Sequence, residues 1–439
     1  MAETAAGSPG RTFDPRRRAY RFMVLLFVSL LTFGSYFAYD SVGAIAPMLI
    51  TALGVGRESI GQMYTLYSIA AILSVFIGGL LIDRIGTRRA SLLFSCLVTV
   101  GALIVAVAPN LWVLYFGRFI FGWGSESLVV AQSSIFARWF KGKELALSFG
   151  IGLTISRLGT LFSFNTEALI ADYFKDYRYA LWAAVIFCVA SLLSNLVYNF
   201  MDRRGERILG LREEGGGDKI VPGDIKRFTS SYWYVTLLCV TFYSAIFPFT
   251  ALSTDFFNTK WGLPMTAGTE GGFLYQVFYN IIHMFTTAGG TTTIIIFASM
   301  VFAPVFGQIA DKFGRRAMMM IAGSVLMVPS FLLMGFTTIP PMFPMIMLGG
   351  AFVLVPAAMW PSIPMIVEKN RVGTAFGLTT MVQNVGLALF PWLNGYLRDI
   401  TDTYAASMLM FSSLGIFGLI FAVLLKRADR RAGGVLERP

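Results

Sequence analysis

The sequence predicts an all-helical membrane protein with twelve transmembrane helices in two bundles of six. Composition indicates that lipid is its solvent, because 56% of the 439 residues are hydrophobic, only 13% are charged and the mean hydropathy is +0.68. Apolar stretches of about 20 residues, the length that crosses a hydrocarbon layer of roughly 30 Å, follow one another along the chain. One long polar connector near the middle separates six of these stretches from six others.

Polar breaks set the limits of each expected span. The first bundle, 21–200, holds spans at 21–48, 59–82, 90–109, 111–137, 145–171 and 179–200. The second bundle, 232–426, holds spans at 233–257, 290–310, 317–337, 342–367, 373–396 and 404–426. Polar tails at 1–20 and 427–439 flank the bundles, and the connector covers 201–231 with three consecutive glycines and a proline.

The basic residues fall into alternate loops. If both termini are cytoplasmic, 28 lysines and arginines lie on the cytoplasmic side and five lie outside, with Arg118 and Arg157 inside spans. This asymmetry is the positive-inside signal of a membrane protein that crosses the bilayer many times. The formal charge of +11 therefore reflects topology, and we expect no nucleic-acid partner.

Residues for metal or redox chemistry are sparse. Cys96, Cys188 and Cys239 stand singly in apolar runs, and His283 is the only histidine. We expect no metal, no cofactor and no catalytic residues, because no nucleophile, base or metal set is visible. The basic start of the chain runs into a long apolar segment without a cleavage site, so the first helix is expected to remain.

The segment 264–289 does not fit the simple scheme. It adds an aromatic run, Phe273 to Phe285, that is too short to cross a bilayer. One interpretation is an interfacial or lid helix on the outer face, and the other is a long or tilted start of the eighth span.

A short pattern occurs twice, after the second and after the eighth span. In each copy a glycine is followed four residues later by aspartate, then a basic residue, a glycine and further basic residues. Such internal repetition is typical of transporters, and glycines with a charged cluster suit a gate whose contacts form in one state and break in the other. The first copy comprises Gly79, Asp83, Arg84, Gly86 and Arg88, and the second comprises Gly307, Asp311, Lys312, Gly314 and Arg315.

This repeated loop resembles the motif of the major facilitator superfamily. The resemblance covers nearly the whole chain and implies the superfamily's fold, alternating access by rocking of two bundles, and a central solute site near the bilayer midplane.

Further segments carry a second likeness, at 33–40, 116–119, 124–128, 139–145, 157–159, 247–249, 359–361, 373–377 and 383–384. They resemble the lysosomal dipeptide-transporter branch of that superfamily, called major facilitator superfamily domain-containing protein one. The likeness implies a dipeptide substrate and a uniporter, although no acidic dileucine signal precedes the first span and the 264–289 segment is extra. We therefore expect a bacterial homologue.

Two opposite charges are expected at one depth near the bilayer centre. Glu126 lies 12 residues from the inner end of its span and Arg157 lies 13 residues from the inner end of the next, which is roughly 18–20 Å in each helix. Charges at this depth are functional candidates. The resemblance implies that Arg157 binds a substrate carboxylate and Glu126 a substrate ammonium, and the alternative is an ion pair that locks two helices.

Asp40 and Arg118 form a second candidate pair, in the outer halves of the first and fourth spans. The pair either senses protonation or acts as a brace. Aromatic and amide side chains complete the expected pocket, because a polar-ended cavity with aromatic walls accepts many peptide sequences. These are Tyr36, Tyr39, Tyr243, Trp360, Gln383 and Asn384.

The sequence thus predicts a monomeric carrier of dipeptides, in contact with membrane lipid. Two alternatives stay open. An organic-anion carrier of the same fold would use Arg118 and Arg157 together. A membrane sensor that transports nothing would usually bring a soluble signalling domain, and no loop in this sequence exceeds about thirty residues.

Overall fold

The computed structural model describes residues 14–140, 144–210, 222–268, 270–368 and 371–438, and every regular element in these ranges is helical. The first half contains α1 (Arg18–Ala44), α2 (Ala46–Leu53), α3 (Arg57–Val107), α4 (Leu111–Phe140), α5 (Leu145–Phe174) and α6 (Arg178–Leu209). The second half contains η2 (Pro222–Arg227), α7 (Ser230–Trp261), α8 (Phe273–Ile282), η3 (Met284–Thr286), α9 (Ala288–Thr292), α10 (Ile294–Phe313), α11 (Arg316–Phe336), α12 (Met342–Ile366), α13 (Val372–Thr401), α14 (Ala405–Arg431) and η5 (Val435–Glu437).

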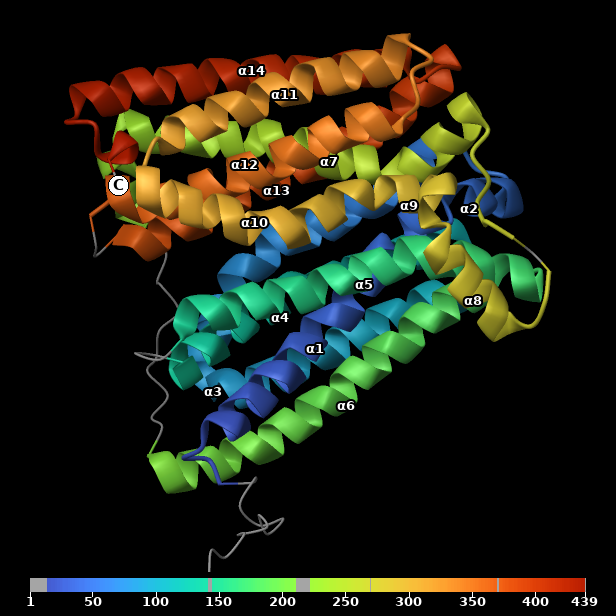
Figure 1. Cartoon of the computed structure of the whole chain (residues 1–439). Helices are drawn as coiled ribbons and strands as arrows, with labels where there is room; N and C mark the ends of the chain where they lie inside the picture. Colours follow the sequence, from blue (N-terminus) through green and yellow to red (C-terminus); the bar gives the residue numbers. More distant parts are fainter. Residues whose placement is uncertain (1–13, 141–143, 211–221, 269, 369–370, 439) are drawn as a thin grey trace, which may run out of the picture.

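The long helices form two bundles of six, because α3 is two spans joined across a kink (Figure 1). The bundles meet where α13 packs on α3, α10 on α5 and α7 on α1. The predicted fold class is therefore confirmed.

The long helices suit a lipid environment. Among the described residues, nine helical segments are long and apolar enough to cross a membrane. Three more spans complete the bundles: 57–85 of α3, then α4, which carries internal charges, and α10. Large apolar side chains are exposed on the bundle faces, such as Ile186 (65%) and Phe200 (70%), which is favourable only against lipid.

The second glycine of each copy of the repeated pattern lies where one span ends and the next begins. Gly86 has φ 82° inside α3, and Gly314 has φ 64° between α10 and α11. Only glycine adopts this left-handed region without strain, so these two glycines let one span turn into the next.

The segment 264–289 holds a separate short helix and is not a simple extension of the eighth span. On α8, the side chains of Leu274, Phe278 and Ile282 are 71%, 66% and 73% exposed, whereas Gln276 and Asn280 are buried. The Asn280 side chain donates to the Asn165 carbonyl of α5 and accepts from the backbone N–H of Ala267. The helix therefore turns its polar face inward and its apolar face outward.

The halves are joined firmly at the end that holds α2 and α8, which we call the closed end. Arg57 of α3 forms an ion pair with Asp255 of α7 (3.0 Å), and the Tyr404 hydroxyl donates to the same carboxylate (2.6 Å). A Cβ atom on Gly61 would lie 2.1 Å from the Pro391 carbonyl oxygen, so α3 and α13 touch backbone to backbone. This end admits no opening without breaking these contacts.

The opposite end, which holds the end of α6 and the C-terminus, is arranged differently (Figure 1). There, the ion pairs given by the described residues stay within one half, as in Arg88 with Glu206 and Arg371 with Asp224. Cβ atoms on Gly79 and Gly307 would meet nothing within 4 Å. The expected close approach at these two glycines is therefore not made in this conformation.

The expected connector is partly helical. Helix α6 continues to Leu209, beyond the predicted limit of 200, and η2 follows at Pro222–Arg227, while 211–221 lie outside the described residues.

Candidate functional site

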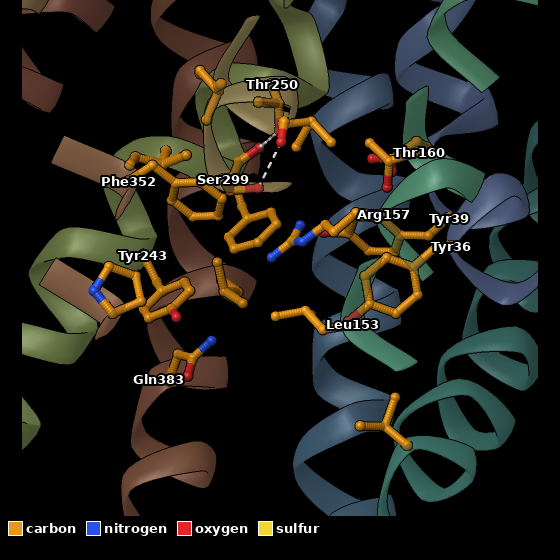
Figure 2. Close-up of a pocket in the computed structure, with 18 of the residues that line it drawn as sticks. Tyr36, Tyr39, Leu153, Arg157, Thr160, Tyr243, Thr250, Ser299, Phe352 and Gln383 are labelled. Carbon is orange, nitrogen blue, oxygen red and sulfur yellow. Dashed lines mark hydrogen bonds between the residues drawn. The ribbon is translucent and has the colours of Figure 1, made fainter. Parts of the chain in front are cut away.

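A cavity of about 450 Å³ lies between the two bundles. Side chains of α1, α3, α4 and α5 line it from the first half, and side chains of α7, α10, α12 and α13 line it from the second. Figure 2 shows that Arg157 points into the space between the halves, with Tyr36 on its own side and Tyr243 and Gln383 opposite. A solute here would contact both bundles at once.

Arg157 is held by aromatic rings from both halves. Its guanidinium carbon lies 5.7 Å from the centre of the Tyr36 ring, 5.8 Å from that of Phe247 and 5.2 Å from that of Phe352. Cation–π contacts of this kind fix a guanidinium over ring faces and leave its N–H groups available to an oxyanion. Within the described part of the chain, Arg157 has no carboxylate within 4 Å.

Glu126 is held by a tyrosine of α3. The Tyr67 hydroxyl donates to Glu126 Oε1 (2.8 Å) and lies 3.0 Å from Ser125 Oγ. A donor on one carboxylate oxygen leaves the other oxygen free to accept from a ligand.

Glu126 and Arg157 both line the cavity, yet they form no ion pair with each other in this conformation. The alternative that they lock two helices together therefore has no contact to support it here. Both charges face a space that a ligand can enter.

Three predicted residues form the wall of the second half. The Trp360 indole N–H donates to the Tyr243 hydroxyl (2.9 Å), and the Tyr243 ring stacks on Phe247 at 5.6 Å. Gln383 also lines the cavity, with its Oε1 3.5 Å from Cys239 Sγ. The wall is thus aromatic with a few polar atoms.

Asn384 is the exception among the predicted lining residues. It is buried, donates to the Thr380 carbonyl of its own helix (3.0 Å) and is absent from the cavity wall. Neighbouring residues on a helix point about 100° apart, and here this rotation turns Asn384 away from the cavity that Gln383 lines.

Asp40 and Arg118 are not in contact as a pair. Asp40 lines the cavity, whereas Arg118 is buried within the first bundle, where it donates to the carbonyls of Ala38 (3.1 Å) and Tyr39 (3.3 Å). Rings of Tyr39, Tyr64, Tyr67 and Phe121 surround its guanidinium at 5.0–5.6 Å. Arg118 thus braces α1 against α3 and α4 and does not face the cavity.

The predicted gating residues lie at the end opposite the closed end. Arg88 contacts Asp202 (3.7 Å) and Glu206 (2.6 Å) of α6, and Arg84 is exposed. Lys312 lies over the Phe313 ring (5.5 Å), and the backbone N–H of Arg315 donates to the Glu437 carbonyl. Asp83 lies on α3, and the side chain of Asp311 falls outside the described residues.

Sequence reasoning missed Tyr67, which donates to Glu126, and Phe352, which lies under the Arg157 guanidinium. It also missed Thr160, which lines the same cavity. Tyr64 and Tyr67 stand three apart in the second span, a spacing that puts both on one helix face and could have marked it. Phe352 has no comparable signal, because nothing near it in the sequence is charged.

Comparisons with known proteins agree with this architecture. A model of the Major Facilitator Superfamily matches residues 28–290 and 271–439. The chain is 32% identical over 449 residues to the lysosomal dipeptide transporter MFSD1 of Homo sapiens, which covers 99% of the chain and 92% of that relative. It is 32% identical to the protein of the same name from Danio rerio, over 97% of the chain and 90% of that relative.

Solved structures share the fold. A crystal structure of the peptide transporter POT in complex with sulfate superposes with a TM-score of 0.73 at 14% identity, over 94% of this chain and 96% of that one. At this identity the likeness concerns the fold alone.

Proposed function

The chain belongs to the Major Facilitator Superfamily, and on that premise we propose that it carries dipeptides across a membrane by alternating access. The relatives named dipeptide transporters, which match over nearly the whole chain, support this substrate class. The cavity supports it too, because aromatic walls and a few polar groups suit peptides of varied side chain.

One observation carries the proposal: the cavity holds a cation and an anion that face it and are not paired with each other. In the proposed complex, Arg157 binds the C-terminal carboxylate of the dipeptide through charge-assisted hydrogen bonds, and Glu126 binds the N-terminal ammonium. Tyr67 orients Glu126, and the three rings around Arg157 orient the guanidinium. Both termini of a zwitterion are then recognised regardless of sequence.

We further propose a bacterial inner membrane, with both termini in the cytoplasm. The 28-to-5 distribution of basic residues supports this orientation. The closed end is then the outer face, and the conformation described here is the inward-facing one. Because one chain supplies both walls of the cavity, the proposed carrier works as a monomer.

The anion-carrier alternative loses its main support. It relied on Arg118 and Arg157 both facing a carboxylate, and Arg118 lies within the first bundle under aromatic rings. A membrane sensor would have no need of a cavity between two bundles that are joined at one end only.

Binding of blocked dipeptides to purified protein tests the assignment. A dipeptide amide should bind poorly to the wild-type protein and lose little further affinity in Arg157→Ala, and an N-acetylated dipeptide should behave likewise in Glu126→Gln. Each lost charge-assisted contact is worth roughly 1.5–3 kcal/mol, about ten- to a hundredfold in affinity.

The same titrations separate the alternatives. An anion carrier would bind the N-acetylated dipeptide as well as the free one. A structural role for the two charges would lower the melting temperature of both variants and weaken free and blocked peptides equally. Either result would overturn the assignment of roles.

A further inference from the structure

The outer face of α6 changes from apolar to basic near the end of the helix. Leu193, Val197 and Phe200 are 57%, 40% and 70% exposed on this face. Arg204 and Arg207 follow at spacings of four and three residues, which keep them on the same side of the helix, and both are exposed. The apolar part faces lipid, and the change from phenylalanine to arginine takes about 6 Å along the helix axis.

Arg203 widens the basic part of this face. It is exposed and lies about 100° from Arg204 around the helix axis. We call Arg203, Arg204 and Arg207 the α6 arginines. Among the described residues, none of the three has a carboxylate within 4 Å. Guanidinium groups in this situation can donate charge-assisted hydrogen bonds to a phosphate.

The acidic residues of the same turn of α6 bind other partners. Asp202 is buried and accepts from Arg138 and from the Trp139 indole N–H (2.7 Å). Glu206 forms an ion pair with Arg88 of α3 (2.6 Å). Both carboxylates thus lie on the inner side of the helix end, and the outer side keeps the positive charge of the α6 arginines.

The start of α1 brings further positive charge to this place (Figure 1). The Tyr20 hydroxyl donates to the Met201 carbonyl (2.8 Å), so the start of α1 lies beside the end of α6. Arg16 and Arg17, directly before α1, are exposed. Two segments far apart in the sequence therefore present arginines at the same end of the first bundle.

We propose that this face of α6 binds an anionic phospholipid from the leaflet opposite the closed end. The acyl chains lie along Leu193, Val197 and Phe200, and the α6 arginines bind the headgroup. Positive charge selects an anionic lipid over a zwitterionic one, and the apolar stripe selects a lipid over a free anion. The inference does not depend on the solute that the protein carries. Because Glu206 holds Arg88 on the inner side of the same turn, the bound lipid anchors the helix end that makes this gate contact.

Titration of delipidated full-length protein with phosphatidylglycerol, followed by native mass spectrometry in a neutral detergent, tests the proposal. Phosphatidylcholine with the same acyl chains is the zwitterionic comparison, and glycerol phosphate is the anion without chains. The wild-type protein should bind phosphatidylglycerol about tenfold more tightly than phosphatidylcholine or better, because each basic residue near anionic lipid contributes roughly fivefold. Glycerol phosphate at equal concentration should not displace the lipid.

Arg204→Gln combined with Arg207→Gln should lower the affinity for phosphatidylglycerol about tenfold or more and leave that for phosphatidylcholine unchanged. Arg204→Lys combined with Arg207→Lys keeps both charges and should retain most of the binding. Lys226→Gln combined with Arg227→Gln is the matched control, in which binding should persist. It removes the same charge from η2, whose two basic residues are exposed at the same end but follow no apolar stripe. Melting temperatures in lipid-free detergent should match the wild type in all three variants.

Three results would contradict the proposal. Unchanged affinity for phosphatidylglycerol in Arg204→Gln with Arg207→Gln would overturn the site. An equal loss in the η2 control would show that the attraction is spread over the whole basic surface, which also overturns the site. Displacement of the lipid by glycerol phosphate at equal concentration would mean that the α6 arginines bind a free anion, and would overturn the assignment to lipid.

Discussion

Asp399, in the second half of the chain, accepts a hydrogen bond of 3.0 Å from the backbone N–H of Arg57, in the first half. A second bond of 2.8 Å comes from the next backbone N–H, that of Glu58. The first turn of α3 thus has its unpaired donors satisfied by a side chain from the other bundle. The stability of this helix start is therefore linked to closure of the two halves.

Asp399→Ala should shift the conformational equilibrium toward opening of the closed end. Loss of an N-terminal cap costs about 1 kcal/mol, which is roughly a fivefold change in the equilibrium constant. Asp399→Asn keeps only one of the two accepting oxygens and should lie between wild type and Asp399→Ala. Spin labels at Thr51→Cys in the first half and Thr338→Cys in the second half, both at the closed end, would report opening as a longer distance between the two labels. An unchanged distance distribution in Asp399→Ala would contradict the linkage.

Tyr67→Phe should weaken binding of free dipeptides by about three- to tenfold. It removes one hydrogen bond to Glu126, and such a bond contributes about 0.5–1.5 kcal/mol. The loss should vanish when Glu126→Gln is also present or when the peptide is N-acetylated, because the contact that Tyr67 orients is then gone. Calorimetric titration of the two single variants and the double variant measures this. Additive losses would show that Tyr67 acts independently of Glu126.

Gly86→Ala should lower thermal stability, whereas Gly79→Ala should leave it nearly unchanged. The left-handed backbone at Gly86 costs an alanine about 1–2 kcal/mol, and a Cβ atom on Gly79 has open space in this conformation. Melting of both variants in detergent distinguishes them. Equal destabilisation would mean that Gly79 is packed in the dominant state.

Cysteine replacements at Gly215 and Val435 should react with a membrane-impermeant reagent only from the cytoplasmic side. The expectation follows from the distribution of basic residues. Thr338→Cys, at the closed end, is the control and should react from outside in intact cells when the closed end faces outward. The opposite labelling pattern would invert the proposed topology and with it the direction in which the cavity opens.

Much of the fold follows from the sequence, because a bilayer permits few solutions for apolar stretches of this length. The depth of Glu126 and Arg157 followed from counting residues along helices of fixed rise. What counting cannot supply is rotation about the helix axis. Arg118 and Glu126 are eight residues apart, about 80° off alignment on an α-helix, and this angle separates a buried brace from a cavity residue.

Contacts between helices also could not be predicted from the sequence. The position of Phe352 over Arg157 depends on how α12 of one bundle sits against α5 of the other, which no local pattern encodes. Glu167 was overlooked for a different reason. It is an acidic residue inside the expected span 145–171, which already marks it as a candidate. That neither of its oxygens has a hydrogen-bond partner among the described residues appears only once the helices are placed around it.

The inverted polarity of α8 limits how far the protein can open. The helix hydrogen-bonds to α5 of the first half, yet its chain continues through residues 283–287 into α9 and α10 of the second. While α8 stays on α5, those five residues limit the distance between the end of α8 and the start of α9. A fully extended chain of that length spans about 18 Å at most. Wider separation at this end requires α8 to leave α5 and expose the amides of Gln276 and Asn280. A bilayer whose thickness holds the apolar face of α8 more firmly should therefore make separation of the two halves at the closed end less favourable.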